Sequence, residues 1–131
     1  MMALGNAYES RVLRHISLAG VELAPRLYKR QWIGYEEPPG RLHAAQPDLF
    51  VLLSNTCVVF EIKLSRCEEG FAQLERLYFP LLWQLFRLPL AGVCVFRNPG
   101  KEYLPFPSRP RSLREALTTP AGYISEWHLL V

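Results

Sequence analysis

Cysteine and long apolar runs are scarce in this sequence, and each shortage excludes a class of protein. The chain has only three cysteines. The spacings of Cys57, Cys67 and Cys94 match no zinc or iron–sulfur pattern, so we predict small apolar side chains in a reducing compartment. The longest apolar run, residues 77–90, is broken by a proline, a glutamine and an arginine. It falls short of the ~18–20 residues of a membrane span, so no membrane segment is predicted.

A targeting signal is also missing from the first ten residues. The segment MMALGNAYES has no basic region followed by an apolar stretch, which is the pattern of a secretory signal peptide. We therefore expect a cytoplasmic protein.

Charge of one sign does not dominate either. The 15 lysines and arginines against 12 acids give a formal net charge of +3, which permits a nucleic-acid partner without implying one. Half of the residues are hydrophobic and 21% are charged, a composition that excludes a disordered chain. With 131 residues, the chain is expected to fold as a single domain over residues 1–131.

Apolar periodicity and turn residues divide the chain into helices and strands. A helix is predicted over residues 6–19, and its apolar arc of Tyr8, Val12 and Ile16 also contains the acidic Glu9. A long helix is predicted to begin at a capping box formed by Ser65 and Glu68 and to be kinked or split at Pro80. The remaining segments are a strand over 21–35, a loop over 36–40, strands over 47–53, 57–63 and 91–96, a short helix over 112–117 and a last strand over 123–131. The order α-β-β-β-α-β, followed by a short helix and a strand, predicts an α/β fold with a mixed central sheet of about five strands flanked by helices.

The central hairpin of this fold brings charged side chains together. A two-residue loop at residues 54–55 places Asp48 directly opposite Glu61. Lys63 points to the same face, whereas Ile62 points away. Two opposed carboxylates repel one another unless a proton or a cation lies between them, and Mg²⁺ prefers such oxygen ligands.

Pro47-Asp48 on the first strand of the hairpin and Glu61-Ile62-Lys63 on the second resemble the PD-(D/E)XK motif of a nuclease superfamily. The surrounding order is also similar: a leading helix with an acid, the hairpin, a helix and an apolar strand. The resemblance covers roughly residues 6–96. It implies a restriction-endonuclease-like core and a nuclease that hydrolyses phosphodiester bonds, with Mg²⁺ or Mn²⁺ as cofactor and DNA as partner.

The resemblance also implies roles for individual residues. Asp48 and Glu61 would be metal ligands, aided by the backbone carbonyl of Ile62. Glu9 would match the extra carboxylate that many members supply from the first helix. Lys63 would orient or deprotonate the attacking water and offset charge on the scissile phosphate.

Gln73 resembles the glutamine that Holliday-junction resolvases, VRR-type nucleases and RecB-like nucleases carry in the next helix. Two departures disfavour a RecB-like exonuclease. Gln73 and Tyr78 stand five residues apart where that pattern has four, and the chain lacks the four cysteines of an iron–sulfur cluster. A structure-specific, junction-resolvase-like DNA endonuclease, generally a homodimer, is therefore the leading interpretation.

Basic and aromatic side chains supply further candidates. Five basic residues are assigned to contacts with backbone phosphates, with solvated charges as the alternative: Arg66 before the long helix, and Arg97, Lys101, Arg109 and Arg111 in the proline-rich stretch. The aromatic residues of the long helix are more typical of a core or a dimer interface than of base stacking: Tyr78, Phe79, Trp83 and Phe86.

Simpler interpretations stay open. Asp48 could begin a strand, Glu61 and Lys63 could lie at a solvated strand end, Glu9 could be a helix N-terminal acid, and Gln73 a surface glutamine. The chain could also be a non-catalytic nucleic-acid- or protein-binding domain on a nuclease-like scaffold. An unrelated α/β domain with a coincidental motif would leave Asp48 and Glu61 far apart.

Overall fold

A five-stranded mixed sheet forms the centre of the computed structural model, which describes residues 4–98 and 109–131. Its strands, in spatial order, are β1 (Leu27–Lys29), β4 (Leu49–Leu52), β5 (Cys57–Ser65), β6 (Leu90–Asn98) and β7 (Ile124–His128). The pairs β1–β4 and β4–β5 are antiparallel, whereas β5–β6 and β6–β7 are parallel. The sheet confirms the prediction of about five strands, although β6 is longer and β7 shorter than their predicted segments.

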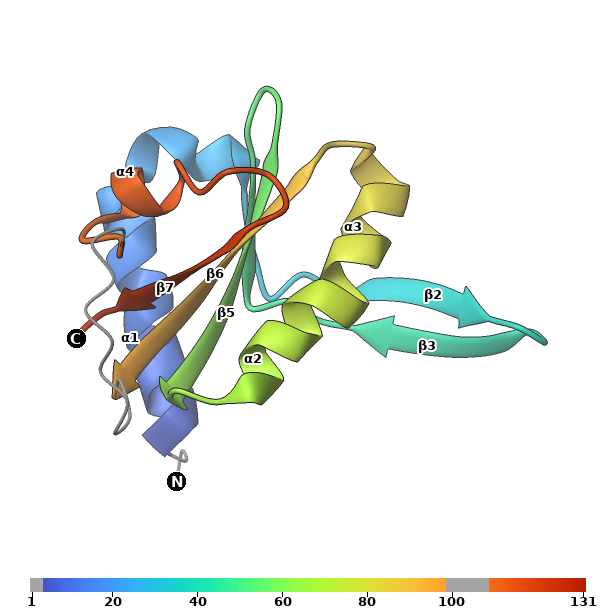
Figure 1. Cartoon of the computed structure of the whole chain (residues 1–131), viewed down its shortest axis with the longest axis horizontal. Coiled ribbons are helices and arrows are strands. Elements are labelled where there is room, and N and C mark those ends of the chain that lie inside the picture. The colour runs from blue at the N-terminus through green and yellow to red at the C-terminus, as the bar shows by residue number, and fades with distance from the viewer. Residues whose placement is uncertain (1–3, 99–108) are drawn as a thin grey trace.

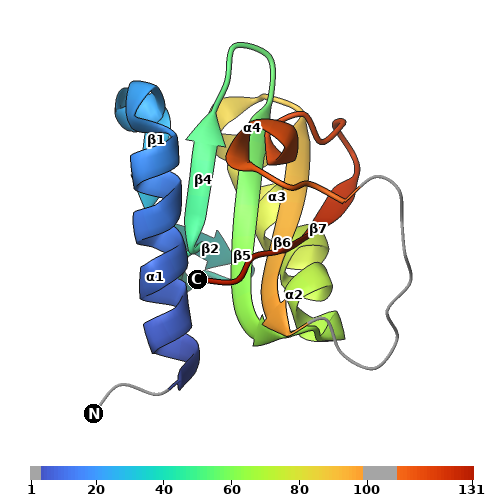
Figure 2. The same ribbon diagram turned by 90° about the vertical axis from the view of Figure 1, so that its left-hand side faces the viewer.

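Helices cover both faces of this sheet (Figures 1 and 2). One face is covered by α1 (Leu4–Ala19) and the short α4 (Leu113–Ala116). The other carries a helical segment made of α2 (Glu68–Gln73), a π-helical turn, η2 (Leu74–Tyr78), and α3 (Phe79–Phe86). The elements at the sheet therefore run α1-β1-β4-β5-α2-β6, which confirms the predicted order and the α/β fold class.

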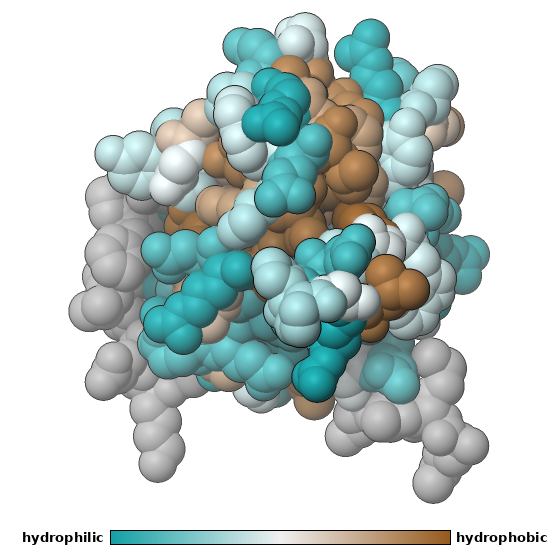
Figure 3. All heavy atoms as spheres, turned by 90° about the vertical axis from the view of Figure 1, so that its right-hand side faces the viewer, coloured by the Kyte–Doolittle hydropathy of each residue, from teal (hydrophilic) through white to brown (hydrophobic). Residues whose placement is uncertain are grey.

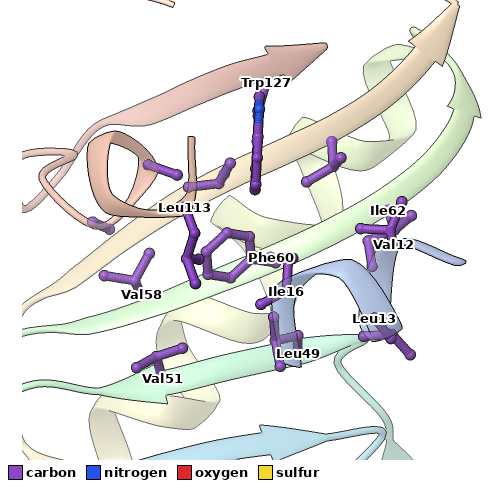
Figure 4. Packing of buried hydrophobic residues seen from close by; sticks show 14 of the residues in the cluster. Val12, Leu13, Ile16, Leu49, Val51, Val58, Phe60, Ile62, Leu113 and Trp127 are labelled. Carbon is purple, nitrogen blue, oxygen red and sulfur yellow. The ribbon is translucent and has the colours of Figure 1, made fainter. Parts of the chain in front are cut away.

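Alternate residues of β4 and β5 point to opposite faces, and each face has its own core. Leu49, Val51 and Phe60 belong to the core beneath α1, together with Ile16 of that helix and Trp127 of β7 (Figure 4). The opposite core, beneath α2 and α3, contains the alternate side chains of the same two strands: Phe50, Cys57 and Val59.

The hairpin register is the predicted one. β4 and β5 pair Leu49 with Phe60, and an N–H···O=C hydrogen bond of 2.8 Å closes the loop around residues 54–55. One further step in this register places Asp48 opposite Glu61. Side-chain alternation within two short strands was sufficient to fix this pairing.

The predicted strand over 21–35 is wrong in its first half. Val21–Arg26 form a 3₁₀ helix, η1, that contains Pro25, and proline has no N–H to donate to a neighbouring strand. Pairing begins only at β1 and stops at Arg30, whose backbone adopts the left-handed conformation (φ 49°).

The predicted loop over 36–40 is also too long, because a second hairpin occupies this region. β2 (Ile33–Glu37) and β3 (Arg41–Ala45) form a two-stranded antiparallel sheet that projects from the body as an arm (Figure 1). Each strand of the arm has one buried residue, at the root. The sequence of β3 therefore carries little of the alternation that identifies a strand.

The long helix begins later than predicted and is not split. β5 continues through Ser65 and α2 starts at Glu68, so these two residues do not form a capping box. Pro80 lies in the first turn of α3, directly after the π-helical turn, in which the Phe79 N–H donates to the Leu74 carbonyl. An extra residue in the preceding turn is an established way for a helix to absorb an interruption.

Gly92 of β6 lets the helical segment approach the sheet. A Cβ at this position would lie 3.0 Å from Leu74 and 3.1 Å from both Ile124 and Phe79. We expect Gly92→Ala to lower the free energy of unfolding by about 1–3 kcal/mol, as overpacking of a core does, measured by urea denaturation. Gly34→Ala on the arm, where a Cβ meets only a backbone oxygen at 4.0 Å, is the control. Equal losses in the two variants would contradict the packing argument.

Candidate functional site

Asp48 and Glu61 are cross-strand neighbours on the side of the sheet covered by α2. Asp48 directly precedes β4, and its Oδ2 accepts a hydrogen bond of 2.7 Å from the N–H of Ile62. Glu61 lies in the middle of β5 with 4% of its surface exposed, and the Ile62 side chain points into the opposite core. This placement excludes a solvated strand end for Glu61 and excludes two carboxylates that lie far apart.

Lys63 is the counterion of Glu61. Its Nζ lies 3.4 Å from Oε1 of Glu61, and its side chain is 28% exposed against 5% for Glu61. Burial alone would lower the pKa of Lys63, but attraction to Glu61, Glu69 and Asp48 outweighs burial and raises that pKa. Lys63 therefore keeps its proton at neutral pH and presents an ammonium group at the mouth of the site.

The half-buried carboxyl group of Asp48 and the buried one of Glu61 both resist ionisation. Burial is the largest cause that raises the pKa of Asp48, and repulsion from Glu9 adds to it, against the hydrogen bond from Ile62. Burial likewise raises the pKa of Glu61, and repulsion from Asp48 adds to it, against the attraction of Lys63. A proton or a cation shared by the pair would relieve this repulsion.

Glu9 joins the pair from α1. No acid lies in the first turn of α1, and Glu9 comes after that turn, where the helix dipole has little effect. Its carboxylate is close enough to Asp48 to raise the pKa of Asp48. Arg30 holds both residues: its Nε donates to Oε1 of Glu9 (3.0 Å) and its backbone N–H donates to the Asp48 carbonyl (3.0 Å). Sequence reasoning missed Arg30, because no pattern marks a left-handed arginine between two strands.

Gln73 and Tyr78 approach the site from the helical segment. A Cβ on Gly70 would lie 3.8 Å from Cγ of Glu61, and Gln73 follows one helical turn later on the same side of α2. The Oε1 atom of Gln73 is buried and has no hydrogen-bond partner within residues 4–98 and 109–131, so Gln73 is not a surface glutamine. Tyr78 is 5% exposed, and its hydroxyl donates to the carbonyl of Gln46 at 3.2 Å. Burial and the nearby carboxylates raise the pKa of Tyr78.

The four basic candidates that the structure describes have different surroundings. Arg97 and Arg111 are exposed, and Lys101 lies outside the described residues. Arg66 and Arg109 instead enter an ion-pair network on β7. The sequence could not predict which of these side chains are bound to acids, and contacts with phosphates remain a prediction.

Glu126 of β7 organises this network, which sequence reasoning missed. Its carboxylate lies 2.9 Å from Nη2 of Arg66 and 4.0 Å from Nη2 of Arg109. In the sheet register, Cys94 is the neighbour of Glu61 on one side and of Glu126 on the other. The network therefore lies on the same sheet face, two strands from the first site. Arg66 and Glu126 are 60 positions apart in the chain, so no local pattern could reveal their ion pair.

A divalent cation is the ligand that this donor set suits. Asp48, Glu61 and Glu9 supply carboxylate oxygens, the ligands that Mg²⁺ and Mn²⁺ take. The Oε2 atom of Glu61 is buried and has no hydrogen-bond partner among the residues that the structure describes. Within the same residues, no group of three or more His, Cys, Asp and Glu side chains forms a ready metal site. Ligation would therefore require the three carboxylates to turn toward a common point.

Comparison with known proteins identifies no relative: no family model, no curated protein and no solved structure matches the chain. Within the described ranges, no helix is long and apolar enough to cross a membrane.

Proposed function

We propose that the chain is a divalent-metal-dependent nuclease that hydrolyses phosphodiester bonds in DNA. The observation that carries the proposal is the cross-strand pair of carboxylates, half-buried Asp48 and buried Glu61, with the Lys63 ammonium 3.4 Å from Glu61. Such a pair destabilises a fold unless a positive charge offsets it. Pro47-Asp48 directly precedes β4 and Glu61-Ile62-Lys63 lies on the neighbouring β5, within an α-β-β-β-α-β core, which supports the resemblance to the PD-(D/E)XK superfamily.

The acids of the site would hold the metal. Asp48 and Glu61 would ligate Mg²⁺ or Mn²⁺, with help from the backbone carbonyl of Ile62 and from Glu9. A bound cation polarises a phosphate and lowers the pKa of a coordinated water. Arg30 would act on the cation only through Glu9 and Asp48, by fixing where their carboxylates lie.

Lys63 and Gln73 would act on the water and the phosphate. Because the pKa of Lys63 is raised, we assign Lys63 the electrostatic role, in which its ammonium offsets charge on the scissile phosphate and orients the attacking water. Gln73 would hold that water or Lys63 through its buried Oε1.

The substrate class can be tested directly. We propose a junction-resolvase-like endonuclease, with a non-catalytic binding domain and a RecB-like exonuclease as alternatives. Purified protein is incubated with labelled single-stranded, duplex, flap and four-way-junction DNA and with matched RNA, in Mg²⁺, in Mn²⁺ or in chelator. Asp48→Asn is expected to abolish metal-dependent cleavage, whereas Glu75→Gln, at an exposed acid of η2, should preserve it. Binding without cleavage in every metal favours the binding domain, and degradation from ends favours the exonuclease.

Arg30→Gly tests whether Arg30 positions the carboxylates of the site or stabilises the fold. Glycine adopts the left-handed conformation of Arg30 (φ 49°) without the penalty of ~1–2 kcal/mol, and the partly exposed ion pair with Glu9 contributes only about 0.2–1 kcal/mol. We therefore expect little change in the free energy of unfolding. Mg²⁺ affinity, measured by calorimetry, should fall about 10- to 100-fold, as it does when an outer-shell partner is lost. Unchanged affinity would remove Arg30 from the metal site.

The homodimer remains a prediction, and α3 offers a surface on which to test it. Trp83 and Leu85 are 45% and 56% exposed, and apolar side chains gather on this side of the molecule with polar side chains around them (Figure 3). If α3 forms the interface, Leu85→Glu should convert a dimer to a monomer in sedimentation velocity. A dimer that survives this substitution uses another surface.

A further inference from the structure

An exposed basic and aromatic segment lies at the root of the arm. Residues 29–32, Lys-Arg-Gln-Trp, are all exposed. Trp32 is 63% exposed, although tryptophan is normally largely buried. Ile33, the next residue, is buried in the core beneath α3, so alternation along the strand turns Trp32 to the opposite side. The indole is therefore not part of the core.

This segment is attached to the acids of the site. Lys29 pairs with Leu49 in the β1–β4 ladder, which is one residue from Asp48. Arg30 donates to the Asp48 carbonyl and to Glu9, and its own carbonyl accepts a hydrogen bond of 2.9 Å from Gln46. Both strands of the arm therefore join the body of the protein beside Asp48. Trp32 lies two residues from Arg30, which holds Glu9.

Charge on the arm is divided between its two ends. The root carries Lys29 and Arg30, whereas the far end carries two acids, Glu36 and Glu37, against one base, Arg41, and Glu37 is 3.2 Å from His43. An anionic strand is therefore attracted to the root rather than to the tip. An exposed aromatic ring beside cations is the combination with which proteins bind single strands, since every base has a face on which to stack.

We propose that Trp32 stacks on an unpaired base of a nucleic-acid strand and that Lys29 contacts a phosphate of the same strand, next to the bond presented to Asp48 and Glu61. The location of that bond rests on the proposed nuclease function, but the stacking contact does not require cleavage. The segment would then select substrates that are single-stranded beside the cleaved bond, such as flaps, ends and junction centres.

Binding can be measured apart from cleavage. Fluorescence anisotropy in chelator compares labelled single-stranded DNA, single-stranded RNA and duplex DNA. Trp32→Ala is expected to weaken single-strand binding roughly 5- to 150-fold, the range for loss of one stacked base, and to affect duplex binding less. Trp32→Phe should recover most of the affinity. Leu42→Ala, at a residue of the same arm that is 81% exposed, should leave binding unchanged.

The outcomes are decisive in both directions. Three results would each overturn the proposal. Trp32→Ala could bind a single strand as tightly as the wild type does, Leu42→Ala could lose as much affinity as Trp32→Ala, or the wild type could bind no single strand. A change in sedimentation alone on Trp32→Ala would also overturn it, in favour of a protein contact. If Trp32→Ala cleaves DNA with the substrate preference of the wild type, the stacking contact is rejected and the proposed nuclease function still stands. Strand binding that depends on Trp32, without cleavage in any metal, would support the contact and reject the nuclease.

Discussion

Lys63→Met is expected to lower the single-turnover cleavage rate about 10²- to 10³-fold, the usual loss when one preorganised group that stabilises transition-state charge is removed. Methionine keeps the length of the apolar stem but removes the ammonium that lies 3.4 Å from Glu61. The Lys63 side chain is 28% exposed, so the fold should survive, which circular dichroism can check. The rate is measured with the oligonucleotide that the wild type cleaves best.

Lys63→Arg is the matched control, because it keeps the positive charge. We expect it to retain more activity than Lys63→Met, although the planar guanidinium places its donors differently. If the two variants lose activity equally, the position rather than the charge of the ammonium matters. Cleavage by Lys63→Met at the wild-type rate would remove Lys63 from the reaction.

Asp48→Asn is expected to stabilise the metal-free protein at pH 8 and to abolish its stabilisation by Mg²⁺. In the folded chain the pKa values of Asp48 and Glu61 are raised, so the folded state binds more protons than the unfolded state above about pH 4. Stability from these groups is complete below their unfolded pKa values and is lost as pH rises through the folded ones. Wild type in chelator should therefore unfold more easily at pH 8 than at pH 5, and Asp48→Asn should show a smaller difference.

Mg²⁺ should reverse this loss in the wild type. At 100 times its Kd, a ligand that binds only the folded state adds about 2.7 kcal/mol of stability, or roughly 10 °C in Tm for a domain of this size. Thermal unfolding with Mg²⁺ and with chelator, at both pH values, measures the effect. Glu75→Gln is the control and should respond as the wild type does. A Mg²⁺ response that persists in both Asp48→Asn and Glu61→Gln would place the cation elsewhere.

The parts of the fold that were predictable depend on local patterns. The opposition of Asp48 and Glu61 followed from a short loop and from alternation within two adjacent strands. The apolar arc of α1 predicted the buried Tyr8, Val12 and Ile16 and left Glu9 on the same side. Such patterns repeat within one element or one tight turn, so a single sequence carries them.

The parts that were not predictable depend on contacts between distant segments. β3 pairs with β2 in an arm that is mostly exposed, so neither strand shows a clear apolar face. Glu126 meets Arg66 only because β7 docks beside β6, far along the chain. The capping box at Ser65 failed for the same reason: pairing with β6 through Asn98 extended the strand past the residue that would otherwise begin a helix.

The π-helical turn changes how spacing along the helical segment should be counted. Gln73 and Tyr78 stand five residues apart, but the turn between them, Leu74–Tyr78, is bonded from residue i to residue i+5 rather than to i+4. Five residues there complete about one revolution, as about four do in an α-helix, so Tyr78 returns to the side of Gln73 and is influenced by Glu61 and Asp48. The one-residue departure from the RecB-like spacing is thus compensated in three dimensions. The subclass of the proposed nuclease is better judged by helical turns than by residue counts, because deletion of one residue from η2 would restore the four-residue spacing of an α-helix and keep Tyr78 on the side of Gln73.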